Sequence, residues 1–232
     1  MSWREDAKRR AAVEAVKHVK DGYIVGLGSG STVEYAIKEL GSAISTQELD
    51  VLGVSTSYHT MMIAVENGIP LTSLDENPEL DIAIDGADQV DFNLNMIKGG
   101  GAALTREKIV DSAARQLVII VDETKLVETL GKNCPVPIEV LPFASSRVMR
   151  RVRDLGGKPA IRKTARKVGP LITDNGHFIL DVDFGPIKDP QKLESQLKLI
   201  PGIVETGLFI GMADIVYVGC KTGFKILKRG KS

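Results

Sequence analysis

The spacing of apolar residues in the first part of the chain alternates between a helix pattern and a strand pattern. Apolar residues recur at helical spacing over residues 5–20, and Asp21-Gly22 ends this helix. A short apolar run at 23–25 leads into a loop of glycine and serine, and a second helical pattern follows it up to Gly41. These residues therefore predict a helix, a strand, a loop and a second helix.

The same alternation continues to residue 125. Strands are predicted at 51–54, 71–74, 81–84 and 117–121, and helices at 57–66 and 104–114. The run at 117–121 is almost wholly apolar, as is typical of a strand covered on both faces. This order predicts an α/β fold with a Rossmann-like, mainly parallel sheet and helices on both faces.

After residue 125 prolines interrupt the pattern. We expect a helix at 144–155, a strand pair around the turn at 174–176, and a helix at 189–199. These elements predict a smaller α+β domain of ferredoxin-like type at 130–205. The larger domain then comprises residues 1–129 and 206–232, because a strand-like run at 213–219 can rejoin the first sheet.

Composition narrows the classes of partner. The 30 lysines and arginines balance 30 aspartates and glutamates, so the chain has no net charge to attract nucleic acid or a membrane surface. Cys134 and Cys220 are far apart and match neither a disulfide framework nor a zinc pattern. The charged start of the chain does not resemble a signal peptide, and no apolar run has transmembrane length. We expect a cytoplasmic protein that binds neither nucleic acid nor a membrane.

The first loop with candidate chemistry is GLGSGST, residues 26–32. Its glycines allow backbone N–H groups to turn inward, and Ser29, Ser31 and Thr32 add hydroxyl groups, which suits a phosphate at a helix start. A dinucleotide fingerprint needs glycine at position 31, and no Gly-Lys-Ser/Thr follows as in a P-loop. The alternative is a capping box of Ser31 and Glu34, with glycines that only make the turn.

The second loop is DGAD, residues 85–88, at the end of a predicted strand. Asp85 and Asp88 could bind sugar hydroxyls, divide acid and base roles, or share a metal. Metal is the weakest of these readings, since no histidine lies nearby and His18, His59 and His177 lack ligand spacing. Aspartates at a strand end can also simply make a turn.

The third loop is KGGGAALTREKI, residues 98–109. Three consecutive glycines imply unusual backbone angles or a close approach. Lys98 and Glu107 on either side suit proton abstraction beside a carbonyl, with the carboxylate as base and the ammonium stabilising the oxyanion. A lone glutamate would more often be a solvated helix residue.

These three loops, in this order, resemble ribose-5-phosphate isomerase of type A. Supporting stretches lie at 155–157, 173–176, 179–181 and 201–209, so the resemblance covers nearly the whole chain. It implies an aldose–ketose isomerase of the non-oxidative pentose phosphate pathway that interconverts D-ribose 5-phosphate and D-ribulose 5-phosphate through an enediolate. It also implies no metal or organic cofactor, and we expect a homodimer or homotetramer.

The resemblance assigns roles by position. Glu107 matches the catalytic base, Asp85 and Asp88 match the pair that handles ring opening and sugar hydroxyls, and Lys98 matches the residue that stabilises the charged intermediate. The substrate-binding positions are Ser29, Gly30, Ser31, Thr32, Gly86, Ala87, Gly99, Gly100 and Gly101, with Lys8 and Lys125 expected at the phosphate.

Two features depart from the family. Ser29 stands where many relatives have threonine, and the basic segment 162–167 is longer than in bacterial relatives; we interpret it as a solvated turn. Other readings are a non-catalytic sugar-phosphate sensor on the same fold, an amino-sugar phosphate deaminase, and a coenzyme A transferase. The sensor would lack Glu107 or Lys98, the deaminase would need a histidine near the carboxylates, and the transferase a nucleophilic glutamate in its own motif.

Overall fold

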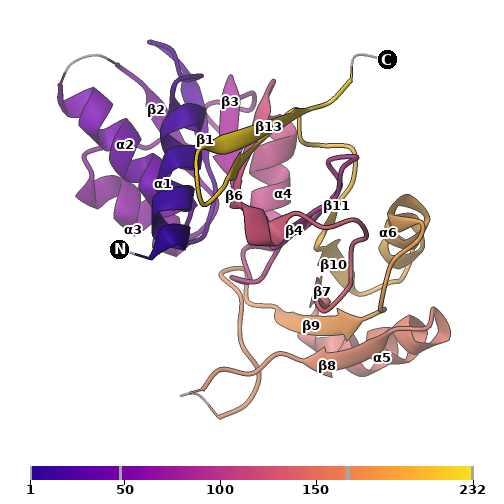
Figure 1. Ribbon diagram of the computed structural model, residues 1–232. Helices are drawn as coiled ribbons and strands as arrows, with labels where there is room; N and C mark the ends of the chain where they lie inside the picture. Colours follow the sequence, from indigo (N-terminus) through magenta and orange to yellow (C-terminus); the bar gives the residue numbers. More distant parts are fainter. Residues whose placement is uncertain (1, 47–48, 166–167, 231–232) are drawn as a thin grey trace.

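A computed structural model describes residues 2–46, 49–165 and 168–230, and its largest sheet has six strands (Figure 1). Their order across the sheet is β13 (Phe224–Lys228), β12 (Ile215–Gly219), β6 (Leu117–Asp122), β3 (Ile82–Asp85), β1 (Ile24–Leu27) and β2 (Leu52–Ser55). Only β13 is antiparallel to its neighbour. The mainly parallel sheet is confirmed, and so is the return of the tail, as β12, to this sheet.

Helices cover both faces of this sheet, as predicted. The helices α1 (Trp3–Val16), α2 (Val33–Ser45) and α3 (Tyr58–Glu66) share one core with Val118 and Ile120 of β6. The alternate residues Leu117, Ile119 and Val121 of β6 face a second core, which includes Leu104 at the start of α4 (Leu104–Ala113). Side chains on a strand alternate between faces, so an apolar β6 is buried on both.

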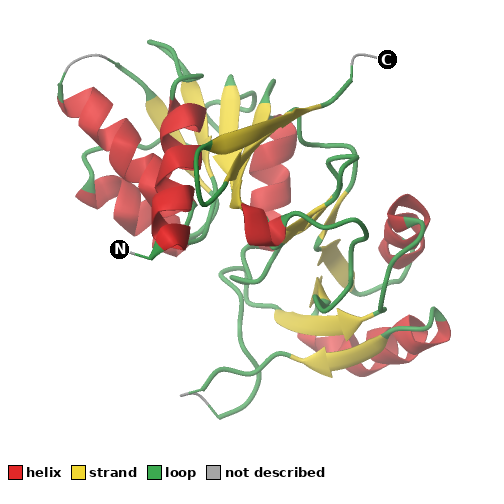
Figure 2. Cartoon of the chain, in the orientation of Figure 1, coloured by secondary structure: helices red, strands yellow, loops and turns green. Residues whose placement is uncertain are grey.

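A second sheet lies in the lower part of Figures 1 and 2 and has four antiparallel strands. Its order is β10 (Ile203–Thr206), β7 (Val136–Val140), β9 (Phe178–Asp183) and β8 (Lys158–Ile161), with helices α5 (Ser145–Asp154) and α6 (Pro190–Lys198). Along the chain this is strand, helix, strand, strand, helix, strand, the ferredoxin-like arrangement. The division into domains 1–129 with 206–232 and 130–205 stays a prediction.

Two predicted strand features are wrong in detail. Residues 71–74 form only an isolated bridge between Leu71 and Gly53. The turn at 174–176 joins one bridge, between Ile172 and Phe178, while the strands that pair with β9 are β7 and β8. Gly169, Gly176 and several charged residues lie between β8 and β9, and the described residues 162–165 and 168–177 form isolated bridges there instead of a continuous ladder.

A small third sheet joins the two larger ones. It consists of β4 (Gln89–Val90), β5 (Met96–Ile97) and β11 (Leu208–Phe209), all antiparallel. The strand β5 leads directly into Lys98, whose backbone N–H donates to the carbonyl of Gly207 at 2.9 Å. This short sheet therefore fixes the backbone that precedes the glycine loop.

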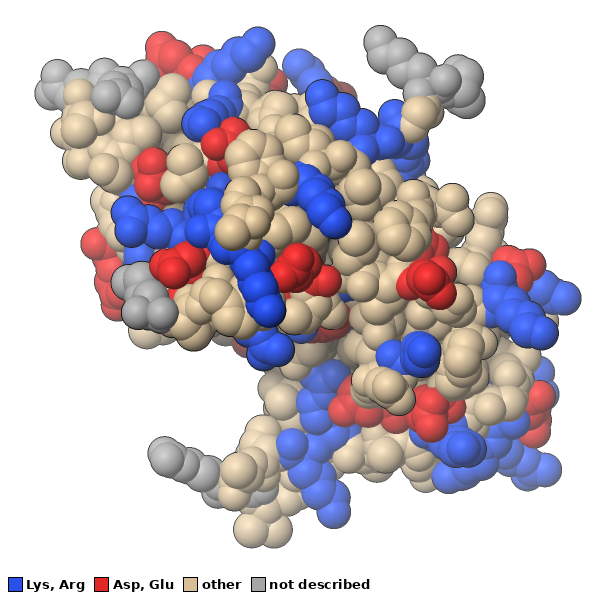
Figure 3. All heavy atoms as spheres, in the orientation of Figure 1, with Lys and Arg blue, Asp and Glu red and all other residues tan. Residues whose placement is uncertain are grey.

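No helix in the described ranges is long and apolar enough to cross a membrane. On the face drawn in Figure 3, lysine and arginine side chains are interspersed with aspartate and glutamate.

Candidate active site

The three predicted loops meet in a pocket of about 280 Å³ at the carboxyl ends of β1, β3 and β6. β1, β3 and β6 are neighbours in the sheet, so the residues that follow them lie side by side. The third loop follows β5 and reaches the same pocket from there. All predicted site residues line this pocket except Asp85, whose side chain is fully buried.

The loop after β1 is shaped by contact with Asp85. The Gly28 N–H donates to the carbonyl of Ile84 at 3.0 Å, and the Ser29 N–H donates to Asp85 Oδ1 at 3.1 Å. A Cβ at position 28 would lie 2.1 Å from Asp85 Oδ1, and Gly30 has φ +113°. Glycine at 28 is needed because a carboxylate occupies the space of a side chain.

Gly28→Ala is expected to lower the free energy of unfolding by about 3 kcal/mol, because the methyl group must displace Asp85 or separate β1 from β3. The matched control is Gly101→Ala, whose Cβ would meet open space. We expect that control to change stability by no more than about 0.5 kcal/mol. Urea unfolding of the two variants measures the difference, and equal stability would contradict the close-packing account.

The Ser31–Glu34 capping box is wrong. The N-cap of α2 is Thr32, and its side chain makes no capping bond within the described chain. Ser31 Oγ accepts a hydrogen bond from Lys8 Nζ at 3.0 Å, and Glu34 Oε1 lies 3.3 Å from His59 Nε2. The hydroxyl of Ser31 is therefore turned towards a cation at the pocket instead of towards its own helix.

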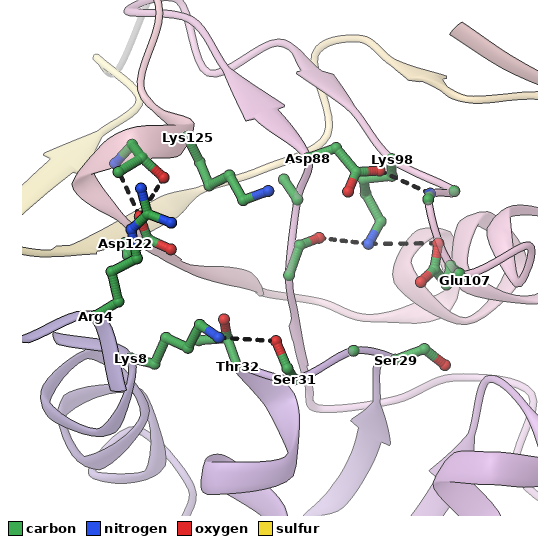
Figure 4. Close-up of a pocket in the computed structure, with 17 residues that line it drawn as sticks. Arg4, Lys8, Ser29, Ser31, Thr32, Asp88, Lys98, Glu107, Asp122 and Lys125 are labelled. Atoms are coloured by element: carbon green, nitrogen blue, oxygen red, sulfur yellow. Dashed lines mark hydrogen bonds and ion pairs between the residues drawn. The ribbon is translucent and has the colours of Figure 1, made fainter. Parts of the chain in front are cut away.

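Ser29 differs from its neighbours in orientation. Its hydroxyl lies 2.8 Å from those of Thr56 and Ser57 and 3.0 Å from that of Thr60. Figure 4 shows this side chain pointing away from Ser31. The backbone of Ser29 is at the pocket while its hydroxyl belongs to a hydroxyl cluster, so the role of that hydroxyl as a substrate donor stays a prediction.

Lys98 is the buried cation of the site, with a side chain 2% exposed. Its ammonium lies 2.8 Å from Asp85 Oδ2 and 3.6 Å from Glu107 Oε2, and it donates to the Gly86 carbonyl at 2.5 Å. Burial lowers the pKa of Lys98, but attraction to Asp85, Glu107 and Asp111 outweighs it and places the pKa above its usual range. Lys98 is therefore a fixed positive charge at neutral pH.

Glu107 has the pKa of a group suited to proton transfer near neutral pH. Burial raises its pKa to about 8, Lys98 opposes this, and the charges of Asp85 and Asp88 add to it. A base is most effective when its pKa lies near the working pH.

The first turn of α4 is held on several sides, which positions Glu107. The residues next to Glu107 all bond to the region of the four-stranded sheet: Thr105 donates to Glu139, Arg106 donates to Asn175 at 2.8 Å, and Lys108 lies 2.9 Å from both Glu194 and Glu205. Glu107 itself turns towards Lys98. Three side chains of the sequence TREK, residues 105–108, thus hold α4 in place, and the remaining one, Glu107, faces Lys98.

Asp88 and Asp85 occupy different positions despite their similar sequence setting. Asp88 lines the pocket and accepts the Gly100 N–H at 2.7 Å. A Cβ on Gly100 would lie 2.7 Å from Asp88 Oδ1, so this glycine too makes room for a carboxylate. Asp85 lies behind the wall, bonded to Lys98, and its burial disfavours direct contact with a ligand.

Figure 4 separates two kinds of group around the pocket. Lys8 and Lys125 lie on one side, and Lys98 and Glu107 lie on the other. Lys8 comes from α1 and Lys125 from the short 3-10 helix η1 (Glu123–Lys125) after β6. This arrangement places two cations on the opposite side of the pocket from the buried pair of Lys98 and Glu107.

A family model for ribose 5-phosphate isomerase A (phosphoriboisomerase A) matches residues 52–223. The chain belongs to the ribose 5-phosphate isomerase A family. Ribose-5-phosphate isomerase A of Methanosarcina acetivorans is 54% identical over 225 residues, which cover 97% of this chain and 95% of that relative.

Solved structures of the family agree with this fold. The ribose 5-phosphate isomerase A of Methanocaldococcus jannaschii has a TM-score of 0.93 and 49% identity, and the match covers 97% of this chain and 99% of that one. A D-ribose-5-phosphate isomerase in complex with phospho-erythronic acid has a TM-score of 0.95 and 46% identity, with the same coverage. The predicted family is confirmed.

Within this member of the ribose 5-phosphate isomerase A family, sequence reasoning missed several residues. Arg4, Asp122 and Thr124 also line the pocket. Asp122 ends β6 just as Asp85 ends β3, and that shared position at a strand end was the available signal. Arg4 has no such signal, because it lies on α1, far from the glycine loops in sequence.

The basic segment 162–167 is only partly described. Arg162 binds Asp181 through two N–H groups and donates to the carbonyls of Gly99 at 2.9 Å and Gly100 at 3.0 Å. The prediction of a solvated turn is wrong for Arg162, which supports the glycine loop from the four-stranded sheet. Residues 166 and 167 lie outside the described residues.

No group of three or more histidine, cysteine, aspartate or glutamate residues within the described ranges has the arrangement to hold a metal ion. The carboxylates of the pocket are instead arranged around the ammonium of Lys98. Whether the enzyme uses a cofactor stays a prediction.

Proposed function

We propose that this chain interconverts D-ribose 5-phosphate and D-ribulose 5-phosphate, with Glu107 as the base that moves a proton between C2 and C1. The observation that carries this proposal is the buried carboxyl group of Glu107, 3.6 Å from the ammonium of Lys98, in the same pocket as two separate lysines, Lys8 and Lys125. An aldose–ketose isomerase of a sugar phosphate needs both, because its phosphate is remote from the reacting carbons.

The proton path follows from the positions of these groups. Ionised Glu107 takes the proton from C2 of the open-chain aldose, and the electrons move to the C1 carbonyl oxygen to give an enediolate. Lys98 stabilises the negative oxygen that develops. Glu107 returns its proton to C1 while the O2 proton passes to O1, which leaves the ketone at C2.

The phosphate anchor lies at the other side of the pocket. Ser31 and Thr32, with the backbone N–H groups at the start of α2, provide donors, and Lys8 and Lys125 provide positive charge. Binding energy from this end holds the open chain with C1 and C2 beside Glu107. The family structure with bound phospho-erythronic acid supports a phosphorylated ligand of this size.

We assign separate roles to the two aspartates. Asp88, at the pocket wall and held by the Gly100 N–H, exchanges protons with the sugar hydroxyls during ring opening. Asp85 is a positioning residue, because it is fully buried and its Oδ2 pairs with Lys98.

The alternatives fit less well. A sugar-phosphate sensor needs the anchor but not a buried carboxyl group with a raised pKa. None of the histidines lines the pocket, although a deaminase of this kind would place one near the carboxylates. An isomerase of a sugar phosphate uses both the cationic anchor and the buried carboxyl group.

Two measurements on the purified protein test the proposal. We expect conversion of ribose 5-phosphate to ribulose 5-phosphate at an unchanged rate after treatment with a chelator, since Lys98 already supplies positive charge beside the reacting carbons. In deuterated water, hydrogen from C2 should exchange with solvent during turnover, because the proton resides on Glu107 between steps. Absence of turnover would refute the assignment, chelator inhibition would indicate a metal, and retention of all C2 hydrogen would favour hydride transfer.

We also propose a cytoplasmic homodimer or homotetramer in the non-oxidative pentose phosphate pathway. These proposals rest on family membership, the balanced charge and the lack of a membrane-spanning helix in the described ranges. Sedimentation of the purified protein distinguishes the two oligomers.

A further inference from the structure

Asp111 is a buried carboxyl group beside the active site that the mechanism above does not use. It lies one turn after Glu107 on α4, is 3% exposed and does not line the pocket. Neither of its oxygens has a hydrogen-bond donor among the described residues, although both are fully enclosed. Ionised oxygens in such a setting are costly, so this carboxyl group needs another explanation.

Asp111 is one of three buried carboxyl groups near Lys98 that have an oxygen without a hydrogen-bond donor among the described residues. Asp85 Oδ2 and Glu107 Oε2 are also buried without a hydrogen bond from a described residue, although each faces the ammonium of Lys98. Three carboxyl groups thus share one buried cation. Three negative charges around one ammonium are unfavourable in a low-dielectric interior, which favours a retained proton among these carboxyl groups.

The surroundings of Asp85 and Asp111 differ in the hydrogen-bond donors that they offer. Asp85 Oδ1 accepts N–H groups from Ser29 at 3.1 Å and Gly86 at 2.6 Å, and Asp85 Oδ2 lies 2.8 Å from Lys98. Both oxygens of Asp85 therefore already face N–H donors or a positive charge. Asp111 has no comparable donors in the described chain.

Burial and the neighbouring carboxyl groups favour a protonated Asp111, and Lys98 opposes them. Burial raises the pKa of Asp111 well above its usual range, Asp85 adds to this, Lys98 opposes it, and Glu107 adds further. Asp111 also lies within hydrogen-bonding reach of Asp85. A proton between these two groups would satisfy an oxygen on each side.

We propose that Asp111 is a positioning residue whose protonated carboxyl group donates a hydrogen bond to Asp85, and thereby holds Asp85 against Lys98. In its neutral form Asp111 also adds no second negative charge beside Glu107. An ionised Asp111 would push the pKa of Glu107 higher and leave less of the base active at neutral pH. The inference rests on the proposed function only for its kinetic test.

Two substitutions at position 111 distinguish the effect of its hydrogen-bond donor from the effect of a carboxylate charge. Asp111→Asn keeps a donor of similar size and cannot ionise, so kcat stays within about threefold of wild type and the acid limb of the kcat/KM profile does not move. Asp111→Leu fills the space without a donor and leaves Asp85 unsatisfied, so kcat falls about tenfold or more. KM for ribose 5-phosphate changes little, because Lys8 and Lys125, which we propose bind its phosphate, lie on the other side of the pocket. The control is Asp75→Asn at an exposed position.

Two results would overturn the proposal. A shift of the acid limb to lower pH by about one unit in Asp111→Asn would mean that Asp111 is ionised in the wild type, since the substitution would then remove a negative charge from beside Glu107. Wild-type kcat in a folded Asp111→Leu variant would mean that the donor has no positioning role.

An infrared measurement tests the protonation state without turnover. Wild-type protein with carbon-13 at its aspartate carboxyl groups should show, at pH 7, a carbonyl band of a protonated carboxylic acid that shifts with the label. Glu107 does not interfere, because it carries no label. Absence of that band in the wild type refutes the proposal even if the variants do not fold, and it is independent of whether ribose 5-phosphate is the substrate.

Discussion

Glu107→Gln is expected to lower kcat for ribose 5-phosphate by about 10²- to 10⁴-fold, the usual contribution of a positioned acid–base group. Glutamine keeps the shape of the side chain but cannot accept the C2 proton. KM should stay close to that of the wild type, because Lys8 and Lys125, which we propose bind the phosphate, lie on the other side of the pocket. Steady-state kinetics measure both constants, and Glu66→Gln on the exposed end of α3 is the matched control.

The pH profile of the wild type provides a second check on Glu107. Its folded-state pKa of about 8 means that the base is mostly protonated at lower pH, so kcat/KM should rise with pH through about 8. A carboxyl group with an ordinary pKa would place this limb about three and a half units lower. A profile that is flat from pH 5 to 9 would contradict the assignment.

As pH rises, the stability of the wild type should fall while kcat/KM rises. The unfolded chain loses the Glu107 proton near pH 4.5 and the folded protein near pH 8, so the wild type loses stability as pH rises between these values. Glu107→Gln removes this loss, and the variant should melt at the same temperature as the wild type or higher at pH 9. An inactive variant that is also less stable would indicate a structural defect instead.

Much of the main fold could be predicted from local pattern. The run 117–121 is apolar on both faces because β6 lies between two cores. The helical patterns of apolar residues before it are long enough to identify the helices. The strand β7 was missed because Pro137 lies within it, and proline usually marks a strand edge or a break. The two-residue strands β4, β5 and β11 are too short to show any periodicity.

The site residues could be predicted where several signals coincide. Lys98, the glycines and Glu107 occur together in one loop, which made each of them informative. Arg162 and Asp111 have no such neighbours in sequence, since Arg162 reaches Gly99 from beyond β8 and Asp111 meets Asp85 of β3 only through the packing of α4. The burial of Asp85 is likewise a tertiary property that its sequence position does not reveal.

Lys98→Met is expected to lower kcat by about 10²- to 10³-fold, the usual cost of removing a group that stabilises a developing oxyanion. It should also move the acid limb of kcat/KM to higher pH. Lys98 is the group that lowers the pKa of Glu107 against burial and against the charges of Asp85 and Asp88, so without it the base holds its proton more tightly.

Lys108→Met is the matched control for Lys98→Met. Lys108 is another poorly exposed lysine near the ring of Phe209, and it binds Glu194 and Glu205, but it does not line the pocket. Its loss should lower stability and leave the acid limb where it is, because Lys108 is not among the groups that shift Glu107. An unshifted limb in Lys98→Met, or an equal shift in Lys108→Met, would mean that the pKa of Glu107 is not set by the ammonium beside it.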